Sequence, residues 1–191
     1  MRCLLCSNWS ITEHICSTCQ NEFLTPNITK EIFYKDIELI SFYSYKDIEQ
    51  LLKLKHTPLG YHVIKILAKL SFTKFAQNFN AESNLSSIAI DDNVESGYSH
   101  TAILNKSLKS NSITPQYNVL RQKNNLHYSE HNLSWRKAHP RNFLLKKINT
   151  KNIILIDDIK TTGLTLKSAI KVLKERNYDV QFVMTLASVR N

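Results

Sequence analysis

Apolar and polar positions change their spacing most clearly around residue 160. Residues 153–156 are four branched apolar side chains in a row, which is typical of a strand buried on both faces of a sheet. Beyond a polar turn, apolar residues recur at the i, i+3, i+4 and i+7 positions of one helical face: Leu166, Ala169, Ile170 and Leu173. Residues 180–183 begin another apolar strand. The pattern predicts strand, turn, helix and strand in succession.

The earlier part of the chain also alternates between strand-like and helix-like patterns. The predicted elements are one or two strands in 34–45, helices in 47–56 and 58–79, a strand in 87–91 and a helix in 98–110. Pro58 suits the first turn of its helix, where no backbone N–H is needed. The order predicts an α/β fold with a mostly parallel sheet flanked by helices.

Length and charge set broad limits on this fold. The 191 residues suffice for a small module, placed at 1–27, and one ordinary domain, placed at 28–191. Lys and Arg total 25 against 16 Asp and Glu, a net charge of +9 that favours nucleic acid, an anionic membrane or a phosphorylated metabolite as partner. No apolar run reaches the roughly 18 residues of a transmembrane helix, so a cytoplasmic protein is expected.

All four cysteines lie in the first nineteen residues, as Cys3-x2-Cys6-x9-Cys16-x2-Cys19. Two Cys-x2-Cys pairs can complete a tetrahedral Zn2+ site, and four thiolates leave no open position for chemistry. Disulfides need an oxidising compartment, and a four-iron cluster usually has less symmetric spacing; both remain alternatives. A structural zinc finger is the prediction, with His14 between the pairs as a loop residue.

The turn after residues 153–156 carries the strongest chemical signal. Asp157 and Asp158 follow the strand, and a hydroxyl-rich turn with Gly163 leads into the next helix. Ligands of open α/β sheets bind at this end of a strand. The turn can gather N–H groups and threonine hydroxyls around a phosphate. The two carboxylates can accept hydrogen bonds from sugar hydroxyls, directly or beside hydrated Mg2+.

Residues 153–165 resemble the phosphoribosyl pyrophosphate (PRPP) motif of type I phosphoribosyltransferases. The resemblance implies that Asp157 and Asp158 meet the ribose hydroxyls. It also implies that six consecutive residues wrap the 5′-phosphate: Lys160, Thr161, Thr162, Gly163, Leu164 and Thr165. Turnover of PRPP would further require an acceptor site, and no residue of the sequence identifies one.

The whole chain resembles the ComF family of competence proteins. The four-cysteine knuckle comes first, then Tyr-Ser-Tyr followed by Leu-Leu-Lys-x-Lys within residues 43–55, and then the PRPP motif. Family members usually have Val-Pro-Val-Pro where this chain has residues 88–91, and Arg-Gly-Phe-Asn-Gln where it has 96–100. Asn125 and Tyr128 also replace a usual threonine and glutamine.

These departures touch the region that would hold pyrophosphate, for which the resemblance leaves Asp91, Arg121 and Lys123 as candidates. They favour binding of PRPP over its turnover. The resemblance implies a protein of natural transformation that handles incoming single-stranded DNA in the cytoplasm, near competence proteins at the inner membrane. The alternative is an active phosphoribosyltransferase that transfers ribose 5-phosphate to an unidentified acceptor.

Residues 121–151 hold most of the excess charge, with eight Lys and Arg against one Glu, a net +7. Cations interleaved with aromatic side chains are typical of single-strand binding surfaces. The candidate nucleic-acid residues are Trp135, Arg136, Lys137, Arg141, Lys146 and Lys147. Two other interpretations remain open: a loop that closes over PRPP, and a solvated loop with a few aromatics tucked into the core.

Overall fold

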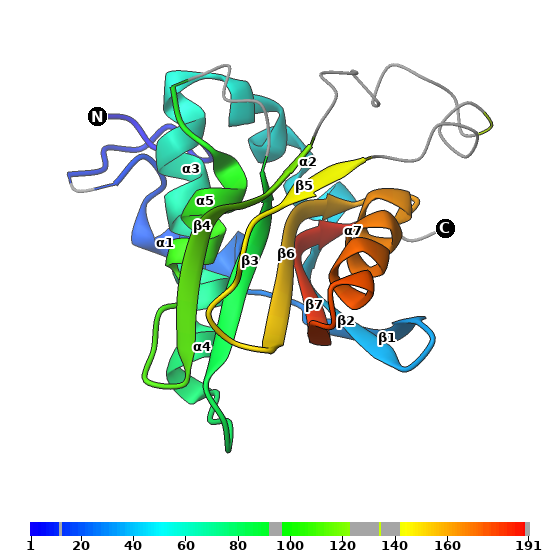
Figure 1. Ribbon diagram of the computed structural model, residues 1–191. Coiled ribbons are helices and arrows are strands. Elements are labelled where there is room, and N and C mark those ends of the chain that lie inside the picture. Colours follow the sequence, from blue (N-terminus) through cyan, green and yellow to red (C-terminus); the bar gives the residue numbers. More distant parts are fainter. Residues whose placement is uncertain (12, 92–96, 123–133, 135–141, 190–191) are drawn as a thin grey trace.

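A seven-stranded sheet forms the centre of the molecule in the computed structural model, which describes residues 1–11, 13–91, 97–122, 134 and 142–189 (Figure 1). From edge to edge the strands are β1 (Thr29–Tyr34), β2 (Ile37–Ser44), β7 (Asp179–Ser188), β6 (Asn152–Lys160), β3 (Leu85–Asp91), β4 (Ile113–Gln122) and β5 (Phe143–Leu145). The five inner strands run parallel, whereas β1 and β5 are antiparallel to their neighbours. This is the α/β fold with a mostly parallel sheet that the sequence predicts.

Helices cover both faces of the sheet (Figure 1). They are α1 (Ser17–Phe23), α2 (Tyr45–Leu52), η1 (Lys53–His56), α3 (Pro58–Ala68), η2 (Lys69–Thr73), α4 (Lys74–Asn78), α5 (His100–Lys106) and α7 (Leu164–Glu175). Ile153 and Leu155 of β6 pack toward α7, while Ile154 and Ile156 pack toward the α2, α3 and α5 side. All four are fully buried, which confirms the prediction of a strand covered on both faces.

The long second helix also forms as expected. Pro58 stands at its first position, and the Thr57 hydroxyl accepts a hydrogen bond from the Gly60 N–H. A π-helical stretch, η2, joins α3 to α4, so helical structure continues to Asn78. Ser71 in that stretch donates to the Leu67 carbonyl at 2.6 Å, which satisfies its buried hydroxyl.

Three strands, β1, β4 and β5, lie wholly or almost wholly where the sequence predicts no element. Strand β4 is hard to predict because its apolar and polar residues do not alternate and because it contains Pro115, which has no N–H to donate to a neighbouring strand. The sheet tolerates Pro115 because β4 pairs only with β3 at that position, and β5 pairs with its other side only from Leu120 onward. Strand β6 also extends to Lys160, beyond the aspartates, because it pairs with β7 as far as Ser188.

The amino-terminal segment packs onto the larger part of the molecule. Cys3, Ile15, Cys19 and Leu24 are buried in the same apolar cluster as helices α2 and α3. The predicted boundary between residues 27 and 28 stays a prediction, and both sides of it share this core. Among the helices that the structure describes, none is long and apolar enough to cross a membrane.

Candidate functional site

The candidate site lies where β3 and β6 are neighbours in the sheet. From β3 the chain continues to β4 on one side, and from β6 it continues to β7 on the other. Such a reversal of strand order opens a crevice at the carboxyl ends of the strands, where ligands of α/β proteins bind. Asp91 ends β3, and Asp157 and Asp158 lie near the end of β6. The fold thus brings three carboxylates from two distant segments to the adjoining ends of β3 and β6, where such a crevice is expected.

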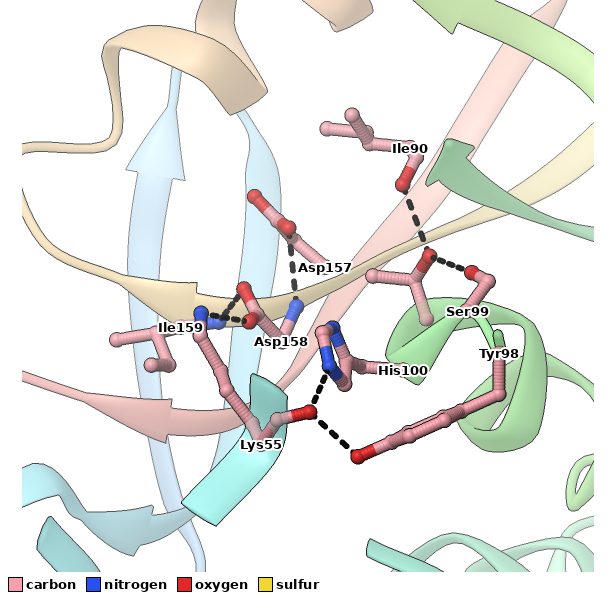
Figure 2. A network of polar contacts seen from close by, with 9 residues as sticks. Lys55, Ile90, Tyr98, Ser99, His100, Asp157, Asp158 and Ile159 are labelled. Atoms are coloured by element: carbon pink, nitrogen blue, oxygen red, sulfur yellow. Dashed lines mark hydrogen bonds and ion pairs between the residues drawn. The ribbon is translucent and has the colours of Figure 1, made fainter. Parts of the chain in front are cut away.

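The two adjacent aspartates make different contacts (Figure 2). Asp157 Oδ1 accepts a hydrogen bond from the Asp158 N–H at 2.9 Å. One carboxylate oxygen of Asp158 accepts from the Ile159 N–H at 2.7 Å, and the other binds the Lys55 ammonium at 2.8 Å. The Asp158 side chain is only 16% exposed. Asp158 therefore uses both oxygens within the protein.

Electrostatics keep Asp158 ionised. Burial by itself raises the pKa of this carboxyl, because the charged form loses hydration. The Lys55 ammonium, helped by His100 and the Ile159 N–H, outweighs burial and holds the pKa below its usual range. The carboxylate and the ammonium form a stable pair at neutral pH.

The backbone of Lys55 is held by the segment that begins α5 (Figure 2). The Tyr98 hydroxyl donates to the Lys55 carbonyl and also lies 3.1 Å from the Thr57 carbonyl. His100, which is 3% exposed, bonds the same Lys55 carbonyl through Nε2, so that nitrogen carries a proton. A side chain on Gly60 would collide with the Tyr98 hydroxyl and the Leu54 carbonyl. Glycine at this position lets the Tyr98 hydroxyl and the Leu54 carbonyl lie close to the backbone of α3.

Helix α5 is in turn anchored to the end of β3. Ser99 caps the helix by accepting from the Ala102 N–H at 3.1 Å. Thr101 is fully buried and donates to the Ile90 carbonyl at 3.0 Å. Contacts from β3 through α5 to η1 thus set the place of Lys55 beside Asp158.

Sequence reasoning assigned no role to Lys55, Tyr98, His100 or Thr101. Lys55 is the last residue of the Leu-Leu-Lys-x-Lys segment, so a signal for it was present in the sequence. Tyr98 and His100 stand where the ComF pattern has phenylalanine and glutamine. Their shared contact with one carbonyl depends on the packing of α5 against η1, which no local pattern reveals.

The turn after β6 has the backbone expected of an anion-binding turn. Gly163 has φ +71°, a left-handed conformation that glycine adopts without strain, and α7 starts at the next residue. The first helical hydrogen bond runs from the Lys167 N–H to the Gly163 carbonyl. The N–H groups of Leu164, Thr165 and Leu166 precede it and have no helical acceptor.

Strand β1 packs against this turn. A Cβ atom on Gly163 would collide with the ring of Phe33. Glu31 binds the Lys160 ammonium at 3.0 Å, and the Lys167 ammonium lies 5.4 Å from the centre of the Phe33 ring. The edge strand β1 thus forms one wall of the turn.

Of the other predicted residues, the structure brings Arg121 close to Asp91. Arg121 Nε lies 3.9 Å from Asp91 Oδ2, and its guanidinium donates to Asn118 Oδ1 at 2.7 Å. Lys146 and Lys147 are exposed beyond the end of β5. The remaining predicted residues lie outside the described part of the chain: Lys123, Trp135, Arg136, Lys137 and Arg141.

The four cysteines form a separate cluster that can hold a metal ion such as zinc. Their sulfur atoms all lie within 4.8 Å of one another, and Cys6 Sγ and Cys16 Sγ are 3.7 Å apart. Sulfurs around tetrahedral Zn2+ are about 3.8 Å apart, because the Zn–S distance is about 2.3 Å. No disulfide joins any of the four. The donor set and its spacing fit zinc.

Local hydrogen bonds prepare the cluster for a cation. Burial raises the pKa of the Cys3 thiol, but the N–H groups of Cys6, Cys16 and Leu5 lower it to about 6. Burial and the neighbouring sulfurs raise the pKa of Cys19. A metal ion reverses this trend, because coordinated thiols are deprotonated.

Comparison with models of known families finds one match over most of the chain. A family model described as PRTase-CE matches residues 21–190. A search of curated proteins finds no match.

Several solved phosphoribosyltransferase structures are similar to the chain. One is a hypoxanthine phosphoribosyltransferase from Staphylococcus aureus, with 18% identity, a TM-score of 0.40, and coverage of 65% of this chain and 62% of that chain. Another is an orotate phosphoribosyltransferase from Aeropyrum pernix, with 15% identity, a TM-score of 0.39, and coverage of 90% and 80%. The chain thus spans less than two thirds of the first of these proteins.

Proposed function

The chain belongs to the PRTase-CE family, and on that premise we propose that the crevice between β3 and β6 binds PRPP together with Mg2+. One observation carries the proposal. The carboxylates of Asp91, Asp157 and Asp158 and the turn at 161–163 meet at the switch point of the sheet. Carboxylates suit ribose hydroxyls and hydrated Mg2+, and the turn suits a phosphate.

The two aspartates have different roles in this proposal. Asp157 is the better candidate for direct contact with the ribose, because both carboxylate oxygens of Asp158 already accept hydrogen bonds, one from Lys55 and one from the Ile159 N–H. Asp158 then acts as a positioning residue that holds Lys55 at the crevice. The Lys55 ammonium adds positive charge on the side where a diphosphate would lie, together with Arg121 near Asp91.

The 5′-phosphate would lie at the turn between β6 and α7. Thr161, Thr162 and Thr165 supply hydroxyl donors there, and the first N–H groups of α7 supply backbone donors. Lys160 would bring a cation, and its ammonium group is ion-paired with Glu31 in the structure. When bound, Mg2+ would neutralise diphosphate charge beside the carboxylates.

Calorimetric titration of the zinc-loaded protein with PRPP and Mg2+ tests this proposal. We expect saturable binding that Asp157→Asn weakens about tenfold or more, because it removes a charged acceptor. Asp179→Asn is the matched control, since this exposed aspartate begins β7 at the opposite end of the sheet. Equal binding by both variants, or no binding of PRPP by the unmodified chain, would contradict the assignment.

The resemblance to ComF proteins extends the proposal to single-stranded DNA, handled near the inner membrane during natural transformation. The supporting observation is the net charge of +7 within residues 121–151, of which Lys146 and Lys147 are exposed. Phosphate contacts make DNA affinity fall with salt, by a slope of about 0.7 per contact for single strands.

A labelled oligonucleotide tests the DNA proposal. Alanine at Arg136, Lys137 and Arg141, or at Lys146 and Lys147, is expected to weaken binding and flatten the salt dependence. Lys171→Ala, on the exposed surface of α7, is the control. If the salt dependence of DNA binding is unchanged in both multiple variants, these residues do not bind the DNA.

The family match also favours a second function, phosphoribosyl transfer. A nucleophile would displace pyrophosphate from the anomeric carbon of PRPP, with the crevice carboxylates stabilising positive charge on the ribose. Release of pyrophosphate across a panel of bases and nucleosides distinguishes the two functions. Release of pyrophosphate in the presence of one acceptor would show that the protein is an enzyme. Binding of PRPP without release of pyrophosphate would show that the domain only binds its ligand.

A further inference from the structure

A cavity of about 590 Å3 is lined by residues of the cysteine-bearing segment and of the helices α3 and α5. Figure 1 shows this segment beside the two helices. Its volume falls within the range of small-molecule sites, about 300 to 1,000 Å3. None of its lining residues belongs to the PRPP motif or to the crevice carboxylates. It is therefore a separate candidate site.

The charge of the cavity is positive. Three lysines, Lys65, Lys69 and Lys106, line it with one carboxylate, Glu13. Glu13 binds the Lys69 ammonium at 3.2 Å and also accepts a hydrogen bond from the Gln20 side chain. Among the residues that the structure describes, no carboxylate is ion-paired with Lys65 or Lys106. Two ammonium groups are thus available to an anion.

An aromatic surface lies beside these ammonium groups. Tyr61 is 37% exposed, and the Lys65 ammonium lies 5.3 Å from the centre of its ring. The His62 ring contacts Tyr61 edge-on, with ring centres 5.3 Å apart, and the half-buried Ile103 adds apolar surface from α5. A planar ring can stack on such a surface, while a phosphate bound to it reaches the lysines.

We propose that this cavity binds a nucleoside monophosphate, with its phosphate at Lys65 and Lys106 and its base against Tyr61. The ammonium groups suit the phosphate, the aromatic ring suits the base, and the cavity has the volume of a small-molecule site. The hydroxyls of Thr73 and Ser107 are further donors on the same lining. The site would take a free nucleotide whether or not the crevice binds PRPP.

The cavity adjoins the crevice without sharing residues with it. The Tyr61 ring lies 5.6 Å from the ring of Tyr98, whose hydroxyl holds the Lys55 carbonyl. Because a nucleotide could also enter the crevice through its 5′-phosphate, the test must separate the two places.

The test measures fluorescence polarisation of N-methylanthraniloyl-AMP with the zinc-loaded full chain at low salt, and competition by unlabelled AMP, GMP, CMP and UMP. We expect saturable binding that the double variant Lys65→Glu/Lys106→Glu weakens about tenfold or more. Lys109→Glu, an exposed charge reversal just beyond α5 and outside the cavity, should change affinity by less than about twofold. Excess PRPP should not displace the probe.

Several results would overturn the proposal. They are no saturable nucleotide binding, equal binding by wild type and the double variant, or full displacement by PRPP, which would place the nucleotide in the crevice. Circular dichroism of the double variant checks that it is folded, and the single variant Lys106→Glu gives an independent reading. Asp157→Asn should leave nucleotide affinity unchanged, so failure of the PRPP proposal is distinguishable from failure of this one.

Discussion

Lys55 and Asp158 are 103 positions apart in the sequence and 2.8 Å apart in the structure. Their side chains are 26% and 16% exposed, so water screens the pair less than it screens a surface ion pair. The Tyr98 and His100 contacts fix the Lys55 backbone, so the ammonium group reaches Asp158 from a backbone that is already held in place. At the residue scale this pair is the structural centre of the candidate site.

Replacing Asp158 by asparagine is expected to lower the free energy of unfolding by about 1 to 3 kcal/mol at neutral pH. The reason is that a largely buried ammonium group loses its charged partner. Denaturant unfolding measures the change. Glu49→Gln is the control, because its pair with Lys53 is exposed and should contribute under about 0.5 kcal/mol. Equal effects of the two substitutions would mean that the Lys55 pair stabilises the protein no more than an exposed ion pair does.

The same pair predicts a dependence on pH. Because the pKa of Asp158 is lowered in the folded state, its contribution is complete above the usual aspartate value of about 4 and is lost as the pH falls through the lower folded value. The stability difference between wild type and Asp158→Asn should therefore be present in full near neutral pH and shrink as the pH falls below about 4. A difference that grows in acid would have the wrong sign.

At the scale of elements, strand β1 and the turn before α7 depend on each other. Gly163 combines a left-handed backbone with a hydrogen atom where any other residue would meet the Phe33 ring. The Glu31–Lys160 pair joins the same two elements. Edge strand β1 is therefore expected to set the shape of the turn that would hold a phosphate.

Gly163→Ala is expected to cost about 1 to 2 kcal/mol of stability and to weaken PRPP binding, because the backbone conformation is strained for alanine. The double variant with Phe33→Ala separates the two causes by a double-mutant cycle. Recovery of stability in the double variant would assign the cost to the collision with Phe33. No recovery would assign it to the backbone. A fully stable, PRPP-binding Gly163→Ala protein would contradict both.

At the scale of the whole molecule, the cysteine cluster and the sheet share one apolar core. Cys3 and Cys19 are each 3% exposed and pack with helices that also cover the sheet. Loss of the metal should therefore affect more than the first nineteen residues. Structural zinc sites contribute directly to folding free energy, because the site exists only in the folded chain.

Cys3→Ser and Cys16→Ser are expected to lose bound zinc and to lower the melting temperature of the whole protein. Metal analysis and thermal unfolding measure the two effects, and a chelator should reproduce them in the wild type. Thr18→Ser, an exposed change between Cys16 and Cys19, is the control. If either cysteine variant melts like the wild type without metal, the cluster has no structural role.

The sequence alone predicted the α/β class, because branched apolar strands and helical apolar faces are local patterns. It also predicted that Asp157 and Asp158 come directly after the buried residues 153–156, and that four cysteines form one cluster. These features depend on spacing within a few residues. They could be stated before any long-range contact was known.

Only the tertiary structure decided which distant residues meet. Sheet order brings Asp91 beside the end of β6, and packing of α5 on η1 places Lys55 against Asp158. Strand β4 was missed because Pro115 breaks the local pattern, whereas one-sided pairing with β3 tolerates it. The cavity with Lys65 and Lys106 exists only because two helices and the cysteine segment come together. Such contacts join residues far apart in the chain, and local periodicity carries no information about them.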